Sequence, residues 1–231
     1  MTDSTAILIL TGAHDHADPW HALDATSEAV ASVLAAVGQV HAITTSSHAH
    51  WPAADLLVVN ATGDLELPAP RSAGVVDGIV AHHRSRRPIL ALHSSALAFR
   101  DDPRWAAIMG GRWVPGVTMH PQIGAALVQT TSADELPDGV IAFDGDFVLY
   151  DERYTSLERA KDAVVVAEHS EDGVRHPVVW WRPATAEHGA VVYDALGHGV
   201  ESFESESHRA WLRATARRLI DSAAERRGNA T

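Results

Sequence analysis

The stretch "PILALHSSALAFR", Pro88 to Arg100, decides the fold class. An apolar run of strand length leads into a turn centred on His93, and a helical pattern follows the turn. Ala91 and Ser95 are the small residues that a tight strand-to-helix turn needs on either side of its apex. Several α/β enzyme classes place a nucleophile at such a turn. The stretch therefore predicts an α/β protein and makes His93 a candidate functional residue.

The chain before this stretch alternates between strand and helix patterns. Ala6 to Gly12 is a continuous apolar run, typical of a strand that is covered on both faces. The helical pattern after it has Asp18 as its expected N-cap and Gly38 as its end. Further elements are expected over Gln39 to Ile43 (strand), Asp55 to Gly63 (strand) and Ala73 to Arg86 (helix). These units predict a doubly wound, mostly parallel sheet, in which ligands bind beyond the carboxyl ends of the strands.

The second half of the chain is richer in strand patterns and predicts an antiparallel extension of the sheet. The expected strands are "QIGAALVQT", "GVIAFDGDFVLYDE", "DAVVVAEHS", "HPVVWWRPA" and "GAVVYDALGHG". A closing helix is expected from about Glu206 to Arg226. Because no repeat and no Pro/Gly/Ser-rich linker marks a boundary, we expect one domain over residues 1–231, with its core at about 6–226.

The composition excludes several classes of function. Lys and Arg total 18 against 30 Asp and Glu, and this formal charge of -12 would repel phosphate backbones and anionic lipids. The absence of cysteine excludes disulfides, thiolate metal sites and a Cys nucleophile. The apolar run at the N-terminus is shorter than the ~20 residues that span a bilayer, and no basic segment precedes it. We therefore expect a cytoplasmic protein that acts on a small molecule, without nucleic-acid or membrane partners.

Polar clusters lie where the predicted strands end. They are His14-Asp15-His16, His93-Ser94-Ser95, His120-Pro121, Asp151-Glu152-Arg153-Tyr154 and Gly197-His198-Gly199. The first cluster could bind an anion, a sugar hydroxyl or a metal, or it could be a solvated loop beside a capping aspartate. His82 and His83, on the second predicted helix, are interpreted as solvated surface residues.

His93 has three possible roles at the apex of the turn. It could act as a general base, bind a metal through a neutral imidazole, or form hydrogen bonds in a purely structural role. Ser94 lies one residue past the apex and the chain has no Gly-x-Ser-x-Gly motif, so a serine hydrolase is disfavoured.

Glu152 and His198 are the other two candidates for chemistry. Glu152 follows the alternating segment "FVLY" and belongs either to an exposed hairpin end or to a site in which it serves as a ligand or as an acid/base group. His198 lies between two glycines after a buried strand, and these glycines allow a ligand to approach the backbone closely.

The order of several motifs resembles that of the ThuA-like, or trehalose-utilisation, family. The motifs are "ILALHSSALAF", "WAAIMGGRWVPGVTMHP", "DFVLYDERYTS" and "HPVVWWRPATAEHGAVVYDALGHG", followed by a last helix that begins near a tryptophan. The resemblance covers roughly Ile7 to Ile220. It implies a flavodoxin-like three-layer sandwich similar to that of the class I glutamine amidotransferases, and a role in the catabolism of trehalose or related sugars.

The resemblance does not imply amidotransferase activity. In the amidotransferases the turn after the strand holds a catalytic cysteine, whereas here it holds His93 and the chain has no cysteine, so thioester chemistry is excluded. His198 falls near the place where that fold has its catalytic histidine, which implies that the corresponding pocket holds two imidazoles.

Two hypotheses for the function follow. In the first, the protein is a lyase, isomerase or hydrolase acting on a sugar or keto-sugar. Its catalytic residues are His93, Glu152 and His198, and its substrate-binding residues are His14, His16, Ser94, Asp151 and Tyr154. Two versions of the site stay open. With a divalent metal such as zinc, the ligands are His93, His120, Glu152 and His198; without a metal, the same groups supply a general base, a general acid and a carboxylate that binds hydroxyls. In the second, the protein is a non-catalytic sugar-binding or scaffolding protein that kept an enzyme fold. A homodimer is compatible with either.

Overall fold

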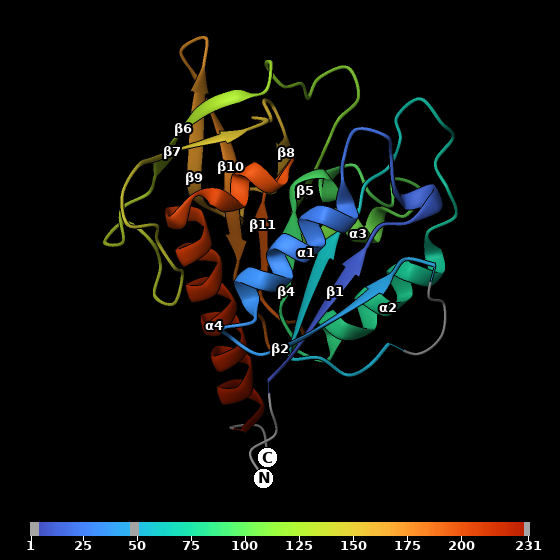
Figure 1. Cartoon of the computed structure of the whole chain (residues 1–231). Coiled ribbons are helices and arrows are strands. Elements are labelled where there is room, and N and C mark those ends of the chain that lie inside the picture. The colour runs from blue at the N-terminus through green and yellow to red at the C-terminus, as the bar shows by residue number, and fades with distance from the viewer. Residues whose placement is uncertain (1–4, 47–50, 229–231) are drawn as a thin grey trace.

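The computed structural model, which describes residues 5–46 and 51–228, is built on a sheet with strand order β2-β1-β3-β4-β11-β10-β9-β6-β7 (Figure 1). The first five strands in this order are parallel. Their bounds are β2 Gln39–Thr44, β1 Ala6–Thr11, β3 Leu56–Asn60, β4 Ile89–Leu92 and β11 Val191–Asp194. The sequence predicted this parallel arrangement for β1 to β4, whereas β11 was expected in the antiparallel extension and instead pairs in parallel with β4. Every residue of β3, β4 and β11 is buried, which explains the continuous apolar runs in these segments.

The remaining strands form the antiparallel extension that the second half of the sequence predicted. They are β10 Val174–Arg182, β9 Val164–Glu171, β6 Gly124–Thr130 and β7 Phe147–Asp151. Two short strands, β5 Gly111–Arg112 and β8 Glu158–Arg159, pair separately. Strand β7 alternates between buried and exposed residues, because one of its faces packs on the core and the other meets solvent. Its carboxyl end brings Asp151 and Glu152 towards the parallel part of the sheet.

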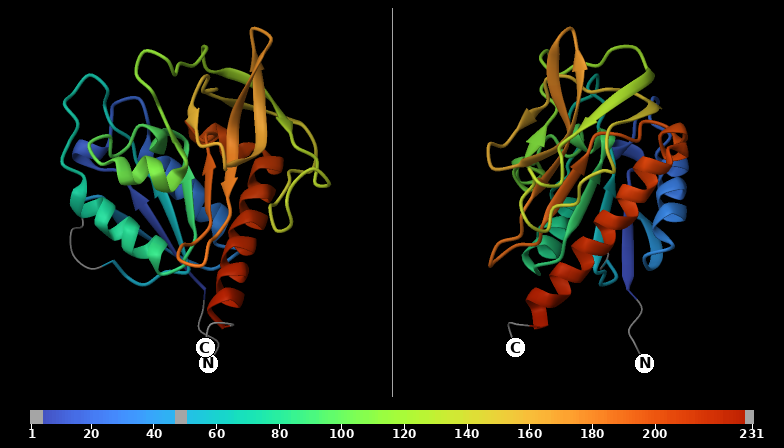
Figure 2. Two further views of the ribbon diagram at one scale, coloured as in Figure 1. Left: turned by 180° about the vertical axis from the view of Figure 1, so that it is seen from behind. Right: turned by 90° about the vertical axis from the view of Figure 1, so that its left-hand side faces the viewer.

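Helices cover both faces of the parallel strands (Figures 1 and 2). Helices α1 Leu23–Leu34 and α4 Glu206–Gly228 pack together on one face. On the other face are α2 Ala73–Arg84 and α3 Pro103–Met109. Short 3-10 turns, η1 His14–His16, η2 His93–Ala96 and η3 Val200–Glu204, follow the carboxyl ends of β1, β4 and β11. The three-layer α/β architecture is therefore confirmed.

Three local expectations were wrong. Helix α1 begins at Leu23, and Asp18 is not its N-cap. The segment after His93 is a 3-10 turn, and the next helix begins at Pro103 with the Asp102 side chain as its cap. The long strand expected before Asp151 is only β7, because Gly139 and Gly145 form turns with positive φ angles of 89° and 81°.

His82 and His83 are not solvated, in contrast to the expectation from the sequence. The Nε2 atom of His82 lies 2.9 Å from the Pro88 carbonyl oxygen, and that of His83 lies 2.9 Å from the Gly189 carbonyl oxygen. Both rings are partly buried and connect α2 to the amino ends of β4 and β11.

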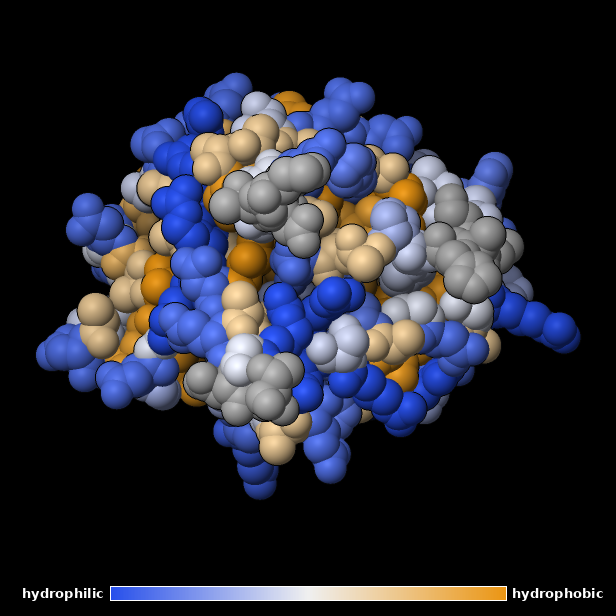
Figure 3. All heavy atoms as spheres, turned by 90° about the horizontal axis from the view of Figure 1, so that it is seen from below, coloured by the Kyte–Doolittle hydropathy of each residue, from blue (hydrophilic) through white to orange (hydrophobic). Residues whose placement is uncertain are grey.

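The face at the amino ends of the parallel strands is mainly polar. Figure 3 shows this face, where hydrophilic side chains predominate and apolar atoms are visible between them. Within residues 5–46 and 51–228, no helix is both long enough and apolar enough to cross a membrane.

Candidate functional site

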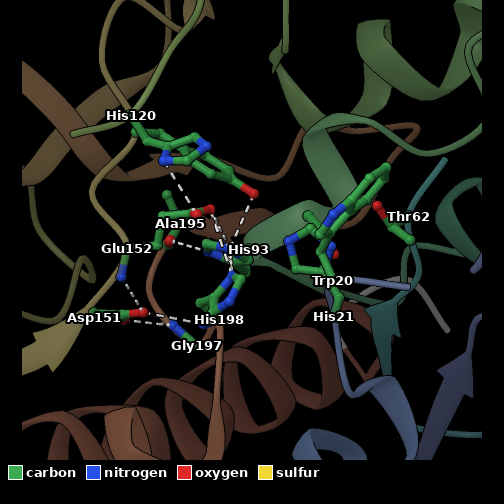
Figure 4. A network of polar contacts seen from close by, with 12 residues as sticks. Trp20, His21, Thr62, His93, His120, Asp151, Glu152, Ala195, Gly197 and His198 are labelled. Carbon is green, nitrogen blue, oxygen red and sulfur yellow. Dashed lines mark hydrogen bonds and ion pairs between the residues drawn. The ribbon is translucent and has the colours of Figure 1, made fainter. Parts of the chain in front are cut away.

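The ring of His93 is fixed at the carboxyl end of β4. His93 has a positive φ of 33°, which is unusual for a residue other than glycine and produces the sharp turn predicted from the sequence. Its Nδ1–H donates to the carbonyl oxygen of Ala195 at 2.6 Å, and the Tyr193 hydroxyl donates to the carbonyl oxygen of His93 at 2.8 Å. Because a carbonyl oxygen only accepts, Nδ1 carries a proton and the neutral ring has its lone pair on Nε2. That nitrogen faces the centre of the site (Figure 4).

Glu152 lies directly after β7 and is 8% exposed. Its Oε2 atom is 3.5 Å from Nε2 of His93 and 3.4 Å from Nδ1 of His198. Burial alone would raise the pKa of Glu152, but the hydrogen bonds and charges of His198 and His93 outweigh it and hold the pKa far below its usual range. Glu152 is therefore a carboxylate that carries its charge inside a largely buried site.

His198 faces both His93 and Glu152. Its Nδ1 atom is 3.3 Å from Nε2 of His93. The hydrogen bond to Glu152 raises the pKa of His198, although burial opposes this shift. The Glu152 carboxylate thus stabilises the imidazolium form of His198, which can give a proton to a bound molecule.

Asp151 positions the loop that carries His198. Its carboxylate accepts hydrogen bonds from the backbone N–H groups of Glu152 at 2.8 Å, Gly197 at 2.8 Å and His198 at 3.1 Å (Figure 4). The Asp151 side chain is 1% exposed. The contacts of Asp151 are therefore those of a positioning residue that joins the end of β7 to the loop after β11.

Tyr154 lies against His93. Its hydroxyl is 2.9 Å from Nε2 of His93 and donates to the lone pair of that nitrogen, and the two rings stack with centroids 4.4 Å apart. Burial raises the pKa of Tyr154 well above its usual value, so the phenol keeps its proton. Tyr154 can therefore donate a hydrogen bond at the centre of the site.

His21 belongs to the same site but was not identified from the sequence. Its Nδ1 atom lies 2.9 and 2.8 Å from the two carboxylate oxygens of Asp18. The same carboxylate accepts hydrogen bonds from the backbone N–H groups of Trp20 and His21 and from the Thr62 hydroxyl. Burial lowers the pKa of His21, and the hydrogen bond to Asp18 opposes this only in part. The His21 ring centroid is 4.9 Å from that of His198 and 5.2 Å from that of His93. The spacing Asp18-x-x-His21 after the first strand is the sequence signal that could have revealed it.

One ligand atom from each of four residues converges at this point. These atoms belong to His21, His93, Glu152 and His198, and they all lie within 4.8 Å of one another. His93, Glu152 and His198 follow the carboxyl ends of β4, β7 and β11, and His21 lies just before α1. The sequence therefore located three of the four groups.

His120 lies at the exposed side of this cluster. Its Nδ1 atom is 3.2 Å from Oε1 of Glu152 and 3.1 Å from the Pro121 carbonyl oxygen. The side chain is 42% exposed (Figure 4). His120 thus contacts the Glu152 oxygen that does not face His93 and His198.

The remaining candidates have other surroundings. His14 is exposed and lines a separate hollow with Asp64 and Arg71. His16 is buried, with its ring edge against Phe99 at a centroid distance of 5.0 Å. Ser94 is 1% exposed, and its hydroxyl lies 3.4 Å from the Ala61 carbonyl oxygen. The contacts of Ser94 are those of a residue that connects the turn to the loop after β3.

Comparison with known protein families and curated sequences shows which family the chain belongs to. A family model described as "ThuA: Trehalose utilisation" matches residues 7–217. The chain belongs to the ThuA family. No curated protein sequence matches this ThuA-family chain.

Solved structures with the same fold include two ThuA-like proteins. The one from Parabacteroides merdae has 12% identity and a TM-score of 0.74, over 94% of this chain and 90% of its own. The one from Bacteroides uniformis has 16% identity and a TM-score of 0.66, over 94% of this chain and 90% of its own. A β-galactosidase from Rahnella sp. R3 has 12% identity and a TM-score of 0.63, over 95% of this chain and 31% of its own. At these identities the likeness concerns the fold.

Proposed function

We propose that this ThuA-family protein is an enzyme of carbohydrate metabolism that acts on a sugar or keto-sugar derivative. Its reaction is of the lyase, isomerase or hydrolase type, and His93, Glu152 and His198 carry it out. The observation that supports this most directly is the convergence of a charged carboxylate and two imidazoles, at 3.3 to 3.5 Å, beyond the carboxyl ends of the strands. The description of the family supports the substrate class.

The three groups divide the acid/base work by their environments. His198, paired with Glu152, acts as the general acid in its imidazolium form. The lone pair on Nε2 of His93 serves as the general base, and the Tyr154 hydroxyl donates a hydrogen bond to a substrate oxygen. In a keto-sugar, the base takes a proton from the carbon next to the carbonyl group. The acid gives a proton either to the carbonyl oxygen, which becomes the hydroxyl of an enediol, or to a leaving-group oxygen, which departs as an alcohol when the C–O bond breaks.

Trp20 supports the assignment to a sugar. It precedes His21 in the chain and is 56% exposed. An exposed aromatic face beside a group of polar side chains is suited to the apolar face and hydroxyl edge of a sugar ring. We therefore expect Trp20 to contribute to substrate binding.

The test is a screen of trehalose, other disaccharides and their keto derivatives, followed by mass spectrometry of the products. The enzyme is compared with Glu152→Gln, which removes the charge at nearly constant shape, and with His188→Ala as a control, because His188 is stacked on His83 away from the site. Turnover should fall at least ~100-fold in Glu152→Gln and stay unchanged in the control. Binding without turnover of any compound would instead favour the non-catalytic sugar-binding alternative.

A further inference from the structure

We propose that His21, His93, Glu152 and His198 bind a divalent metal ion of the zinc type. This inference deepens the proposed function and rests on it for the use of the metal in catalysis, whereas metal binding is a property that can be measured without substrate. The base and acid roles given above for His93 and His198 are those of the metal-free site. With the ion bound, both imidazoles would be neutral ligands, and the metal would supply a polarised carbonyl or an activated water in their place. The set differs from the one expected from the sequence, because His21 takes the place of His120.

The spacing of three of the groups fits a metal ion. The distance from Nε2 of His93 to Nδ1 of His198 is 3.3 Å, and Oε2 of Glu152 lies 3.4 Å from the latter and 3.5 Å from the former. Zinc–nitrogen and zinc–oxygen bonds of 2.0–2.2 Å place tetrahedral ligands about 3.3 Å apart. These separations are longer than ordinary hydrogen bonds between such groups, which are about 2.7–3.0 Å. The three atoms are therefore arranged as corners of one coordination shell.

His21 supplies an independent observation. The Asp18 carboxylate holds the proton on Nδ1, so the neutral ring presents the lone pair of Nε2. That Nε2 atom is buried and has no hydrogen-bond partner within the described part of the chain. An unsatisfied buried polar atom costs about 1–3 kcal/mol. A metal ion in the centre of the cluster would satisfy it, since a ring nitrogen of His21 lies within 4.8 Å of the other ligand atoms and Nδ1 is already bound to Asp18.

The surrounding contacts are those of a metal site. Metal-binding histidines donate their second ring N–H to a carboxylate or a carbonyl oxygen, which fixes the ring and the tautomer. His21 does so to Asp18 and His93 does so to Ala195. The backbone of His198 is held by Asp151. Imidazole nitrogens together with one carboxylate oxygen suit zinc and related transition metals better than magnesium or calcium.

His120 does not offer a ligand atom in this arrangement. Both neighbours of its Nδ1 atom, Oε1 of Glu152 and the Pro121 carbonyl oxygen, are acceptors. Nδ1 carries a proton in this arrangement, and His120 is not among the residues whose ligand atoms converge. His120 contacts Glu152 from outside the cluster, so its removal should weaken metal binding less than the removal of a ligand.

The test measures metal binding by the full chain. Protein stripped with a chelator is titrated with Zn²⁺ against a chromophoric competitor, and with Co²⁺ while the visible absorption of the cobalt is followed. We expect one equivalent to bind and at least ~100-fold weaker binding in His21→Ala and Glu152→Gln. His120→Ala should weaken binding only about 10-fold, and the control His188→Ala, away from the site, should leave it unchanged. Circular dichroism melts of the metal-free variants establish that each is folded, and Glu152→Gln preserves the shape of the site if His21→Ala is unstable.

Several results would overturn the inference. The first is a wild type that binds no stoichiometric metal. The second is unchanged metal affinity in folded His21→Ala or Glu152→Gln. The third is a loss of metal affinity in His120→Ala as large as that in His21→Ala. Turnover by fully metal-free protein would likewise remove the catalytic use of the metal while leaving the proposed function intact. Tight metal binding without turnover of any sugar would support the metal site and contradict the proposed sugar enzyme.

Discussion

The Nε2 atom of His208, in α4, lies 2.8 Å from Oδ2 of Asp194, the last residue of β11, and both side chains are fully buried. The other ring nitrogen of His208 donates to the Ser202 carbonyl oxygen at 3.1 Å. Both ring nitrogens thus face acceptors, which fits the charged imidazolium. Oδ1 of Asp194 also accepts from the backbone N–H of Leu196 at 3.0 Å. The pair therefore connects the last helix to the loop that leads to His198.

Removing one member of this pair should destabilise the fold strongly. His208→Ala leaves the Asp194 carboxylate buried without its partner, and we expect a loss of about 3–5 kcal/mol in the free energy of unfolding. Urea unfolding followed by circular dichroism measures it. The control is Glu158→Ala, which breaks an exposed pair with Arg112 and should change stability by less than about 0.5 kcal/mol. A loss in His208→Ala no larger than that in the control would contradict the prediction.

The same pair gives stability a dependence on alkaline pH. Burial opposes the shift, but the charge and hydrogen bond of Asp194 outweigh it and raise the pKa of His208 above 6.5. Because the folded state binds this proton more tightly than the unfolded chain, the stabilisation is complete below pH 6.5. It is lost as the pH rises through the raised pKa of the folded state. Between pH 6.5 and 9, the wild type should lose stability more steeply than His208→Gln, and equal slopes would contradict this.

Because of buried His82, we expect the stability of the fold to fall as the pH is lowered below neutral. Burial lowers the pKa of His82 to about 4, and the hydrogen bond to Pro88 opposes this only in part. Since the unfolded chain then binds the proton more tightly, the stabilisation is complete above pH 6.5 and is lost as the pH falls towards 4. Between pH 7 and 4.5, urea midpoints should show that the wild type loses roughly 2 kcal/mol more than His82→Gln. The control His41→Gln, on an exposed strand position, should behave like the wild type.

Gly197 is needed for the position of His198. Gly197 has a φ of 109°, and a Cβ atom there would lie 3.1 Å from the Phe203 ring. Gly197→Ala should destabilise the fold by about 1–3 kcal/mol and weaken zinc binding by at least ~10-fold, because the loop carrying His198 must shift. Gly116→Ala is the matched control, since Gly116 has a φ of 75° but a Cβ atom there would meet nothing within 4 Å. Equal effects in thermal melts and zinc titrations would show that strain alone matters.

The architecture could be predicted because the alternation of apolar runs and amphipathic stretches is recorded locally in the sequence. The sharp turn at His93 was recognisable from its small neighbours, and His93 adopts a positive φ of 33° there. The helix and strand boundaries that were predicted wrongly depend on single residues. Asp18 follows a strand and precedes a proline, as an N-cap does, yet it accepts from Trp20 and His21 in a turn that precedes the helix.

Only some of the residues of the candidate site could be predicted from the sequence. His93, Glu152 and His198 follow strands whose carboxyl ends meet at one edge, so their convergence could be expected from topology. His21 lies in a segment that the apolar pattern assigned to a helix. Its direction is set by Asp18, and the Asp18 side chain is held in turn by the hydroxyl of Thr62, which is 44 residues further along the chain. Sequence patterns do not contain such tertiary hydrogen bonds.

Substitution of Tyr154 distinguishes metal binding from catalysis. In the structure its hydroxyl donates to Nε2 of His93, the nitrogen that we assign to the metal, so metal binding must displace this hydrogen bond. Tyr154→Phe removes the competing donor at nearly constant shape. We expect zinc affinity to stay within ~3-fold of the wild type or to increase, and turnover to fall at least ~10-fold because a hydrogen-bond donor to the substrate is lost. A fall in zinc affinity of more than tenfold would show instead that the phenol oxygen is itself a ligand, and the four-residue set would then be incomplete.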